Sequence, residues 1–438
     1  MKKLDVWIEI EGRQVYAGTI EGTDGTDACF CYAESYLHRE NCQAVSVSLP
    51  VRPESFTAEQ TRNFFEGLLP EGYTRRTVAQ WLHVDETDYL SILEGLGNEC
   101  LGAIRITSDR QPELHTSYEQ ISPQKIRELA EEGAVKSTEL LVKTHLSLTG
   151  ASGKVGLYYE PQAEQWYMPM GLAPSTHILK QSHVRLDSIV TNEQLSLLTA
   201  LKLGIDVPDS FIVKAEEETE ELSGESKANV LLATARYDRI FPKKKKMIGG
   251  LPVPLRLHQE DFAQALGISA ADKYETEDKG ETSGYLRRMF DLLRKYSADP
   301  ITDQTRLWNI IVFNALLGNT DSHIKNFSLL YHADLGAMRL APAYDLLSTS
   351  VYESSTRDLA FRIGDAWSLD QLTRDCFEQA AEEAGLGRKF AMKQFDKICN
   401  GFDAALHEAG SYLEMQGFYA AGRIAERIFE TGGSRLLS

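Results

Sequence analysis

The chain is poor in the residues that mark several specialised classes of protein. Its 438 residues include only six cysteines and 14 prolines, and no two cysteines form a CxxC pair. Apolar runs are short, because Asn309 and Asn314 interrupt the longest candidate, residues 307–317. Basic residues are the minority charge: 46 Lys and Arg against 64 Asp and Glu give a net charge of −18.

Each of these shortages excludes or disfavours a class of protein. Without CxxC pairs, a zinc ribbon is not predicted, and in a cytoplasmic chain of this size the six thiols are expected to be free. No run reaches the ~18 apolar residues of a membrane-spanning helix. The first residues lack the apolar stretch of a signal peptide, so a cytoplasmic protein is expected. The acidity disfavours a chain that wraps nucleic acid by itself.

One block of the sequence is densely basic. It is Lys243–Lys246, which lies between Pro242 and the pair Gly249 and Gly250. The block is interpreted either as a solvated loop or as a docking site for an acidic partner.

The residues that are present describe a globular protein. Hydrophobic residues make up 42% of the chain and charged residues 25%, which is ordinary for a soluble fold. The length allows two to three units of ~150 residues. No repeat of 20–50 residues is visible, which excludes solenoids and propellers.

Hydrophobic periodicity predicts a sheet-rich part followed by a helical part. Strands are expected at residues 4–10, 14–20, 28–32, 102–106, 155–159, 165–168, 177–180, 211–214 and 229–234. Helices are expected at residues 57–68, 192–203, 301–317, 369–385, 390–408 and 424–430. Residues 108–132 are interpreted as a polar, helix-prone connection. One hairpin, residues 327–331 and 337–340, interrupts the helical part, and a nucleotide is expected in a cleft between the two lobes.

Residues 147–154 read SLTGASGK and carry the first chemical motif. Gly150 and Gly153 let backbone N–H groups approach a phosphate. The segment is not a Walker A loop, because Leu148 stands where the first glycine belongs and Val155 follows Lys154. A plain tight turn remains the alternative.

Lys180 ends a predicted strand, and Glu193 follows thirteen residues later, near the start of a predicted helix. A strand lysine held by a helix glutamate can contact the α- and β-phosphates of ATP. Surface lysines near glutamates are also common without any function.

The strongest motif is residues 319–328, NTDSHIKNFS. Asp321 and Asn326 are five residues apart, the spacing of the base and the metal-binding asparagine in a protein-kinase catalytic loop. Asp345 follows the predicted hairpin, where a second metal-binding aspartate belongs. The alternative is that Asp321 caps a helix and Asp345 begins a turn. His323 has no histidine or cysteine at ligand spacing, so a zinc site is disfavoured.

The order of these motifs resembles the HipA family of bacterial serine/threonine kinases, the toxins of toxin–antitoxin pairs. The resemblance rests on SLTGASGK, HILK, ARYDR, LHQEDFAQALG, NTDSHIKNFS and LAPAYDL, and on VSLP, NFFEGLLPE and LGNECLGAIRI near the N-terminus. It covers almost the whole chain. It implies an α+β, protein-kinase-like fold with a sheet-rich N-lobe and a helical C-lobe, preceded by a small N-terminal α/β subdomain. The expected divisions are residues 1–108, 109–236 and 237–438.

The resemblance also implies cofactors and partners. Family members bind ATP with Mg²⁺ and pair with a small helix-turn-helix antitoxin of the HipB type, through which DNA is contacted indirectly. One branch phosphorylates an aminoacyl-tRNA synthetase, so a translation-related protein is the expected substrate.

Roles carry over residue by residue. Asp321 matches the catalytic base, Asn326 and Asp345 match the magnesium ligands, and His323 is expected to position phosphate or substrate. Ser147 matches a serine that such kinases phosphorylate on themselves. The expected nucleotide contacts are Thr149, Gly150, Ala151, Ser152, Gly153, Lys154, Lys180 with Glu193, Ala235, Tyr237, Asp238 and Gln259.

Two positions depart from the family pattern. Ala235 replaces a hinge glutamate, which costs little if adenine is bound through the backbone. Ser322 follows Asp321 where glycine is frequent, which is a strain only if that position needs positive φ. An active toxin kinase is therefore expected. The alternatives are a kinase-like corepressor that holds an antitoxin, and a small-molecule phosphotransferase, which shares the aspartates.

Overall fold

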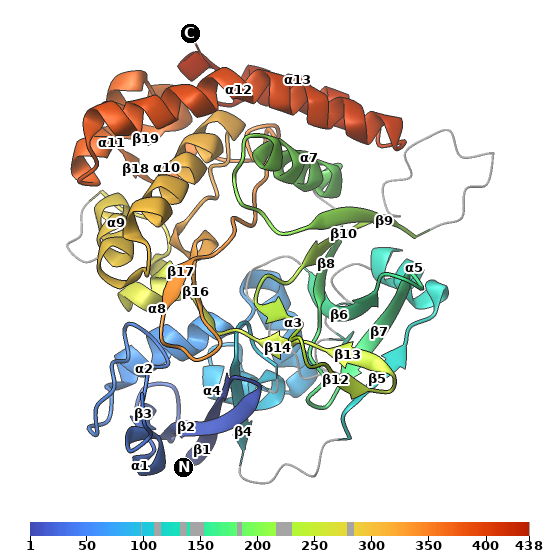
Figure 1. Cartoon of the computed structure of the whole chain (residues 1–438), viewed down its shortest axis with the longest axis vertical. Coiled ribbons are helices and arrows are strands. Elements are labelled where there is room, and N and C mark those ends of the chain that lie inside the picture. Colours follow the sequence, from blue (N-terminus) through green and yellow to red (C-terminus); the bar gives the residue numbers. More distant parts are fainter. Residues whose placement is uncertain are drawn as a thin grey trace. The chain divides into compact units, whose positions relative to one another are not determined.

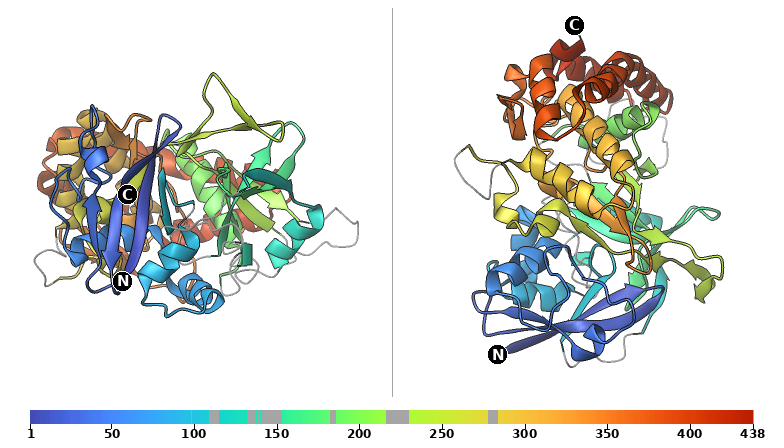
Figure 2. Two further views of the ribbon diagram at one scale, coloured as in Figure 1. Left: turned by 90° about the horizontal axis from the view of Figure 1, so that it is seen from below. Right: turned by 60° about the vertical axis from the view of Figure 1, so that its left-hand side comes forward.

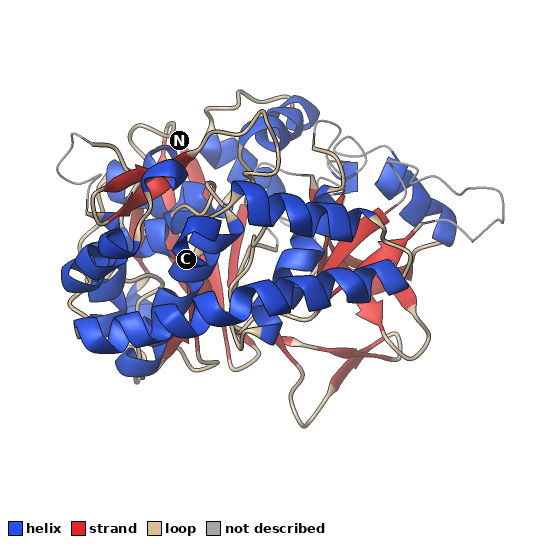
Figure 3. Cartoon of the chain, turned by 90° about the horizontal axis from the view of Figure 1, so that it is seen from above, coloured by secondary structure: helices blue, strands red, loops and turns tan. Residues whose placement is uncertain are grey.

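The computed structural model describes the chain except residues 98, 109–114, 132–136, 138, 141–152, 182–185, 216–229, 278–283 and 438 (Figure 1). The chain forms two compact units. Unit 1 comprises Met1–His183, Val213–Glu260 and Leu330–Ala337. Unit 2 comprises Val184–Ile212, Asp261–Leu329 and Met338–Ser438. The predicted α+β class is confirmed, because the chain forms both helices and sheets, as Figure 3 shows.

Unit 1 opens with a four-stranded antiparallel sheet in the order β3-β2-β1-β4. The strands are β1 (Lys2–Ile10), β2 (Arg13–Gly22), β3 (Cys29–Tyr32) and β4 (Ile104–Ser108). Alternate residues of β1, such as Leu4, Val6 and Ile8, are buried, which is the period-2 pattern of a sheet with one face in a core. The helices between β3 and β4 are α1 (Glu34–Leu37), α2 (Ala58–Phe65), η1 (Glu66–Leu68), α3 (Gly72–Leu82) and α4 (Tyr89–Leu96).

A six-stranded sheet follows, in the order β5-β7-β6-β8-β10-β9. Its strands are β5 (Ser117–Gln120), β6 (Lys154–Glu160), β7 (Gln165–Met170), β8 (His177–Gln181), β9 (Ser210–Lys214) and β10 (Val230–Ala235). The helix-prone character expected at residues 108–132 is confirmed by α5 (Pro123–Glu131), whereas the strand β5 in the same segment was not predicted. Tyr118 anchors β5: its ring lies 4.4 Å from that of Tyr158, and its hydroxyl donates to the Pro174 carbonyl at 2.9 Å.

The basic block Lys243–Lys246 belongs to an arm of unit 1 that is built from two pairs of short strands. Its strands are β11 (Arg239–Ile240), β12 (Lys246–Ile248), β13 (Leu251–Val253) and β14 (Leu255–Arg256), with β11 paired to β14 and β12 to β13. Figure 2 shows the arm extending from the rest of unit 1. All four lysines are exposed, and none forms an ion pair with another described residue.

Unit 2 is mainly helical. Its helices are α7 (Ile189–Lys202), α8 (Phe262–Leu266), η2 (Ala270–Asp272), α9 (Tyr285–Tyr296), α10 (Pro300–Leu317), η4 (Ile324–Asn326), η5 (Leu369–Gln371), α11 (Arg374–Glu383), α12 (Arg388–Met415), α13 (Ala420–Thr431) and η6 (Ser434–Leu437). The predictions missed α9 and made α12 too short. Among the described residues, no helix is long and apolar enough to cross a membrane.

The predicted hairpin is confirmed as β16 (Ser328–Tyr331) and β17 (Met338–Leu340), and β15 (Gln259–Asp261) pairs with β16. A second hairpin, β18 (Asp358–Ile363) and β19 (Ala366–Ser368), was not predicted. All six cysteines are free thiols, as expected.

Two buried side chains fix an N-terminal loop within unit 1. The His258 Nε2 lies 2.8 Å from the Val45 carbonyl oxygen. The Glu260 carboxylate accepts hydrogen bonds from the Ser46 hydroxyl at 2.5 Å and the Val47 N–H at 3.0 Å. Burial lowers the pKa of His258 to about 4, so the imidazole stays neutral in the folded chain at pH 7.

Stability is predicted to fall on acidification because of His258. An unfolded histidine takes up a proton near pH 6.5, whereas the folded one resists until about pH 4. Protonation therefore favours unfolding between these values, by up to about 3 kcal/mol. Denaturant unfolding measured from pH 7.5 to pH 4.5 checks this. His258→Gln keeps an N–H donor for the Val45 carbonyl and is expected to flatten the dependence; an equally steep loss in that variant would assign it to other groups.

Candidate active site

The NTDSHIKNFS segment forms a loop between a capped helix and a strand in unit 2. The Asp299 side chain accepts from the Thr302 N–H at 3.3 Å, and Pro300 follows as the first residue of α10. These are common helix-start features. Gly318 ends α10 with φ +70°, a conformation that glycine adopts without strain. The chain therefore leaves the helix abruptly, and Asp321 follows three residues later.

Asn319 ties this loop to the segment that carries Asp345. Its Oδ1 accepts from the Asp321 N–H at 3.2 Å. Its Nδ2 donates to Asn314 Oδ1 at 2.8 Å and to the Asp345 carbonyl oxygen at 3.2 Å. No role was predicted for Asn319, although its place at the end of a long helix, two residues before an aspartate, is a usable signal.

The predicted base and metal ligand are hydrogen-bonded within one turn. The Asn326 Nδ2 donates to the Asp321 carbonyl oxygen at 2.9 Å, and the His323 N–H donates to the same oxygen at 2.8 Å. The Asp321 side chain is exposed, and His323 is buried. Because the side-chain nitrogen of Asn326 already donates a hydrogen bond, Oδ1 is the atom through which this residue can bind a cation. The structure therefore brings Asp321, His323 and Asn326 together.

The departure at Ser322 carries no backbone strain. Ser322 is not among the described residues with positive φ, so glycine is not required after Asp321. Asp345 does have positive φ, at +53°, which aspartate tolerates better than most residues. The unusual backbone of this site thus lies at a predicted metal ligand.

A buried ion pair holds the second half of the loop. The Lys325 Nζ lies 2.7 Å from Asp261 Oδ2, and both side chains are almost fully buried. The other carboxylate oxygen of Asp261 accepts the Gln264 N–H at 2.9 Å, while the Gln264 side chain accepts the Asp261 N–H. This capping box begins α8. One aspartate therefore caps a helix and neutralises a lysine of the loop.

The predicted phosphate contacts are only partly described. Ser147 and Thr149, Gly150, Ala151 and Ser152 lie outside the described residues. Gly153 precedes β6, which begins at the buried Lys154, and Lys154 pairs across the strands with Lys180 of β8. Glu193 is buried in α7 of unit 2. The proposed pair of Lys180 with Glu193 stays a prediction.

The hinge residues are held within unit 1. Ala235 is the last residue of β10. The Tyr237 hydroxyl donates to Gln259 Oε1, and Gln259 Nε2 donates to Asp238 Oδ2 at 3.1 Å. Asp238 also accepts the Gly102 N–H at 2.8 Å. These bonds brace the hinge, and the expected contacts of Gln259 and Asp238 with a nucleotide stay predictions.

Asp238 belongs to a buried cluster of charges with Arg236, Arg239 and Glu99. Arg236 Nη2 lies 2.8 Å from Asp238 Oδ2, and Arg239 Nη2 lies 3.0 Å from Glu99 Oε1. Burial alone would raise the pKa of Asp238, but Arg236 and Arg239 hold it well below its usual value. Asp238 is thus a buried anion in the protein's own network.

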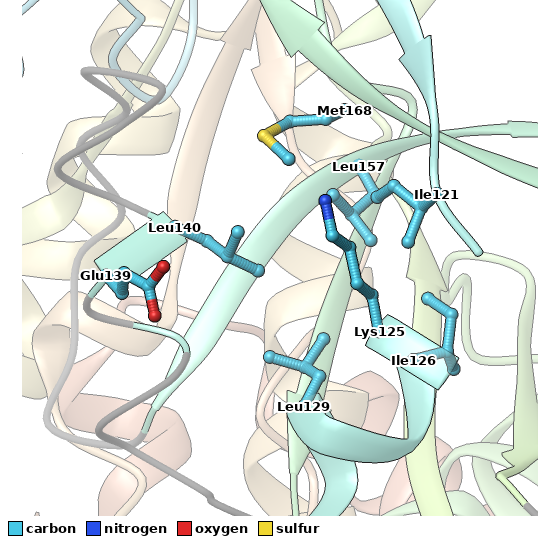
Figure 4. Close-up of a pocket in the computed structure, with 8 residues that line it drawn as sticks. All are labelled: Ile121, Lys125, Ile126, Leu129, Glu139, Leu140, Leu157 and Met168. Carbon is cyan, nitrogen blue, oxygen red and sulfur yellow. The ribbon is translucent and has the colours of Figure 1, made fainter. Parts of the chain in front are cut away.

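A small cavity lies in unit 1 between α5 and the sheet (Figure 4). Ile126 and Leu129 of α5 face Leu157 and Met168 across it, and Lys125 borders it. Its volume is about 40 Å³, far below the ~300 Å³ at which small-molecule sites begin. The cavity does not fit a nucleotide.

Family profiles match both parts of the chain. The HipA N-terminal domain matches residues 4–107, and the HipA-like C-terminal domain matches residues 146–406. Y4mE of Sinorhizobium fredii is 33% identical over 423 residues, which are 94% of this chain and 92% of that protein. The serine/threonine-protein kinase toxin HipA of Shewanella oneidensis is 26% identical over 361 residues, 80% of this chain and 78% of that protein.

A solved structure shares the fold. It is a complex of Shewanella oneidensis HipA, HipB and operator DNA, matched with a TM-score of 0.78 and 22% identity. The match covers 99% of this chain and 97% of that one. This likeness confirms the kinase-like fold that the motifs implied.

Breaking the Asp261–Lys325 pair is predicted to destabilise unit 2. Asp261→Asn keeps a good helix cap but removes the carboxylate charge that lies 2.7 Å from the buried Lys325 ammonium. Such a loss costs roughly 3–5 kcal/mol, measurable as a lower denaturant midpoint. The matched control is the double variant Asp261→Asn, Lys325→Met, which removes both charges and is expected to regain most of the stability. A single variant as stable as the wild type would show that the pair is not needed.

Proposed function

The chain belongs to the HipA family, and on that premise we propose that it is an ATP- and Mg²⁺-dependent serine/threonine protein kinase, the toxin of a toxin–antitoxin pair. One observation carries the proposal. Asn319 binds both the Asp321 N–H and the Asp345 carbonyl, and Asn326 binds the Asp321 carbonyl. The proposed base therefore bonds directly to one proposed metal ligand, Asn326, and is connected to the other, Asp345, through Asn319.

The proposed reaction transfers the γ-phosphoryl group of ATP to a protein hydroxyl. A bond forms between the acceptor oxygen and phosphorus, the bond from phosphorus to the bridging oxygen of ADP breaks, and the acceptor proton passes to Asp321. Most of the rate enhancement in such a reaction comes from positioning and charge neutralisation. The loop supplies the positioning, because its hydrogen bonds fix the backbone of Asp321 at both its N–H and its carbonyl.

The donor set suits magnesium held jointly with a nucleotide. Mg²⁺ prefers oxygen ligands and often takes one or two protein oxygens with the phosphates supplying more. Asn326 Oδ1 and the Asp345 carboxylate are such donors. Among the described residues no cluster of three or more His, Cys, Asp or Glu is arranged for a metal, so a nucleotide-independent site is not proposed. When bound, the ion neutralises charge that develops on the phosphoryl oxygens.

We further propose that the partner is a small helix-turn-helix antitoxin. The support is the fold shared with a protein solved together with HipB and operator DNA. The net charge of −18 favours DNA contact through a basic partner over direct wrapping. A corepressor without catalysis remains the second candidate, and the experiment below separates the two by the behaviour of the wild type.

Asp321→Asn is predicted to reduce phosphoryl transfer to a small residual rate, because an amide cannot accept the acceptor proton. The side chain is exposed, so the fold should be unaffected. Purified protein incubated with Mg²⁺ and ATP is examined by intact-protein mass spectrometry. We expect a phosphate mass gain only in the wild type, mapping to Ser147. ATP affinity should be unchanged in the variant. Equal mass gain in both proteins would contradict the role of Asp321, and ATP binding without transfer in the wild type would favour the corepressor.

A further inference from the structure

Tyr274 touches the proposed base from outside the catalytic loop. It lies between η2 and α9 of unit 2, and its hydroxyl donates a hydrogen bond to Asp321 Oδ1. Its ring meets the His323 imidazole edge-on, with centroids 5.2 Å apart and planes inclined by 79°. The Lys273 ammonium lies 5.4 Å from the same ring. Neither the kinase-loop spacing nor the nucleotide motifs account for this tyrosine.

The residue after Tyr274 is a fixed anchor. Glu275 is buried, and its carboxylate accepts hydrogen bonds from the Gly284 N–H at the start of α9 and from the Arg362 N–H of β18 at 2.8 Å. Its own N–H donates to the Ala360 carbonyl at 2.8 Å. A carboxylate at a helix N-terminus is also favoured by the helix dipole. The backbone of Tyr274 is therefore held on both α9 and β18.

The hydrogen bond from Tyr274 to Asp321 could either block the base or orient it, and the contacts around Tyr274 favour orientation. A phenol that only blocked the base would have to swing away before each transfer. The bonds of Glu275 fix the backbone beside Tyr274, and the edge-on contact with His323 holds the ring in place. A carboxylate offers two oxygens, so a donor on Oδ1 fixes the plane of the group and does not use up the second oxygen.

We propose that Tyr274 is a positioning residue for phosphoryl transfer, whose hydroxyl orients the Asp321 carboxylate toward the acceptor hydroxyl. The arrangement follows the general logic of a catalytic base held by a third group. The inference rests on the proposed role of Asp321 as base. Tyr274 itself gains and loses no covalent bond in the reaction.

The test is Tyr274→Phe, which removes the hydroxyl and keeps the ring against His323. ADP formation from Mg²⁺ and ATP counts every transfer, whatever the acceptor. We expect the maximal rate to fall roughly tenfold or more, the usual effect of losing a hydrogen bond to a charged group. The ATP concentration at half-maximal rate and the thermal midpoint should stay at wild-type values, because neither nucleotide binding nor the Glu275 anchor is altered.

The matched control is Tyr285→Phe. It removes a neighbouring hydroxyl that donates to the Asp272 carbonyl and not to the base, so its maximal rate should equal that of the wild type. A second comparison uses the residual rate of Asp321→Asn. Adding Tyr274→Phe to that variant should cause no further loss, since residues that act as a unit are not additive.

The outcomes separate the inference from the proposed function. An active wild type with an equally active Tyr274→Phe variant would overturn the positioning role and leave the kinase intact. A slow variant with a raised half-saturating ATP concentration, a lowered thermal midpoint or an additive loss on Asp321→Asn would assign Tyr274 a structural role and also overturn it. A wild type that forms no ADP would overturn the proposed function, and the inference with it.

Discussion

The ion pair of Asp261 and Lys325 is the constraint on which the geometry of the candidate active site depends. The Lys325 Nζ and Asp261 Oδ2 atoms lie 2.7 Å apart, and both charged groups are buried away from water. Lys325 directly precedes Asn326 in the chain. A buried charge must keep its partner, since leaving it alone is far more costly than the pair itself. Any shift of the catalytic loop relative to the start of α8 would therefore separate Lys325 from Asp261. Asn319 and Asn326 then set the backbone of Asp321 within this fixed frame.

The segment LHQEDFAQALG illustrates how a polar motif can be structural. His258, Gln259, Glu260 and Asp261 are consecutive and all buried, which would be costly without hydrogen-bond partners. Each of these four side chains bonds to a different residue. In order, these partners include Val45, Asp238, Ser46 and Lys325. The motif therefore stabilises an N-terminal loop, the hinge and the catalytic loop through successive residues, and a direct contact with nucleotide is not needed to explain its composition.

Sequence reasoning succeeded where the relevant interactions are local. The spacing of Asp321 and Asn326 places both in one turn, and the hairpin after them follows from short apolar runs around a turn. It failed where distant contacts decide. β5 is a strand because Tyr118 packs on Tyr158, forty residues away. The contact of Tyr274 with Asp321 spans 47 residues and leaves no periodic signal. The predicted boundaries at residues 108 and 236 stay predictions, as do the roles of the phosphate-loop residues.

The central claim is that Asn326 and Asp345 hold a metal–nucleotide complex in front of Asp321. A crystal structure of the protein with Mg²⁺ and a non-hydrolysable ATP analogue tests it most directly. The account predicts an ion at the ~2.0–2.1 Å expected for magnesium from Asn326 Oδ1 and an Asp345 carboxylate oxygen, with the Asp321 carboxylate facing the terminal phosphate. An ion bound without either residue, or a terminal phosphate directed away from Asp321, would contradict it.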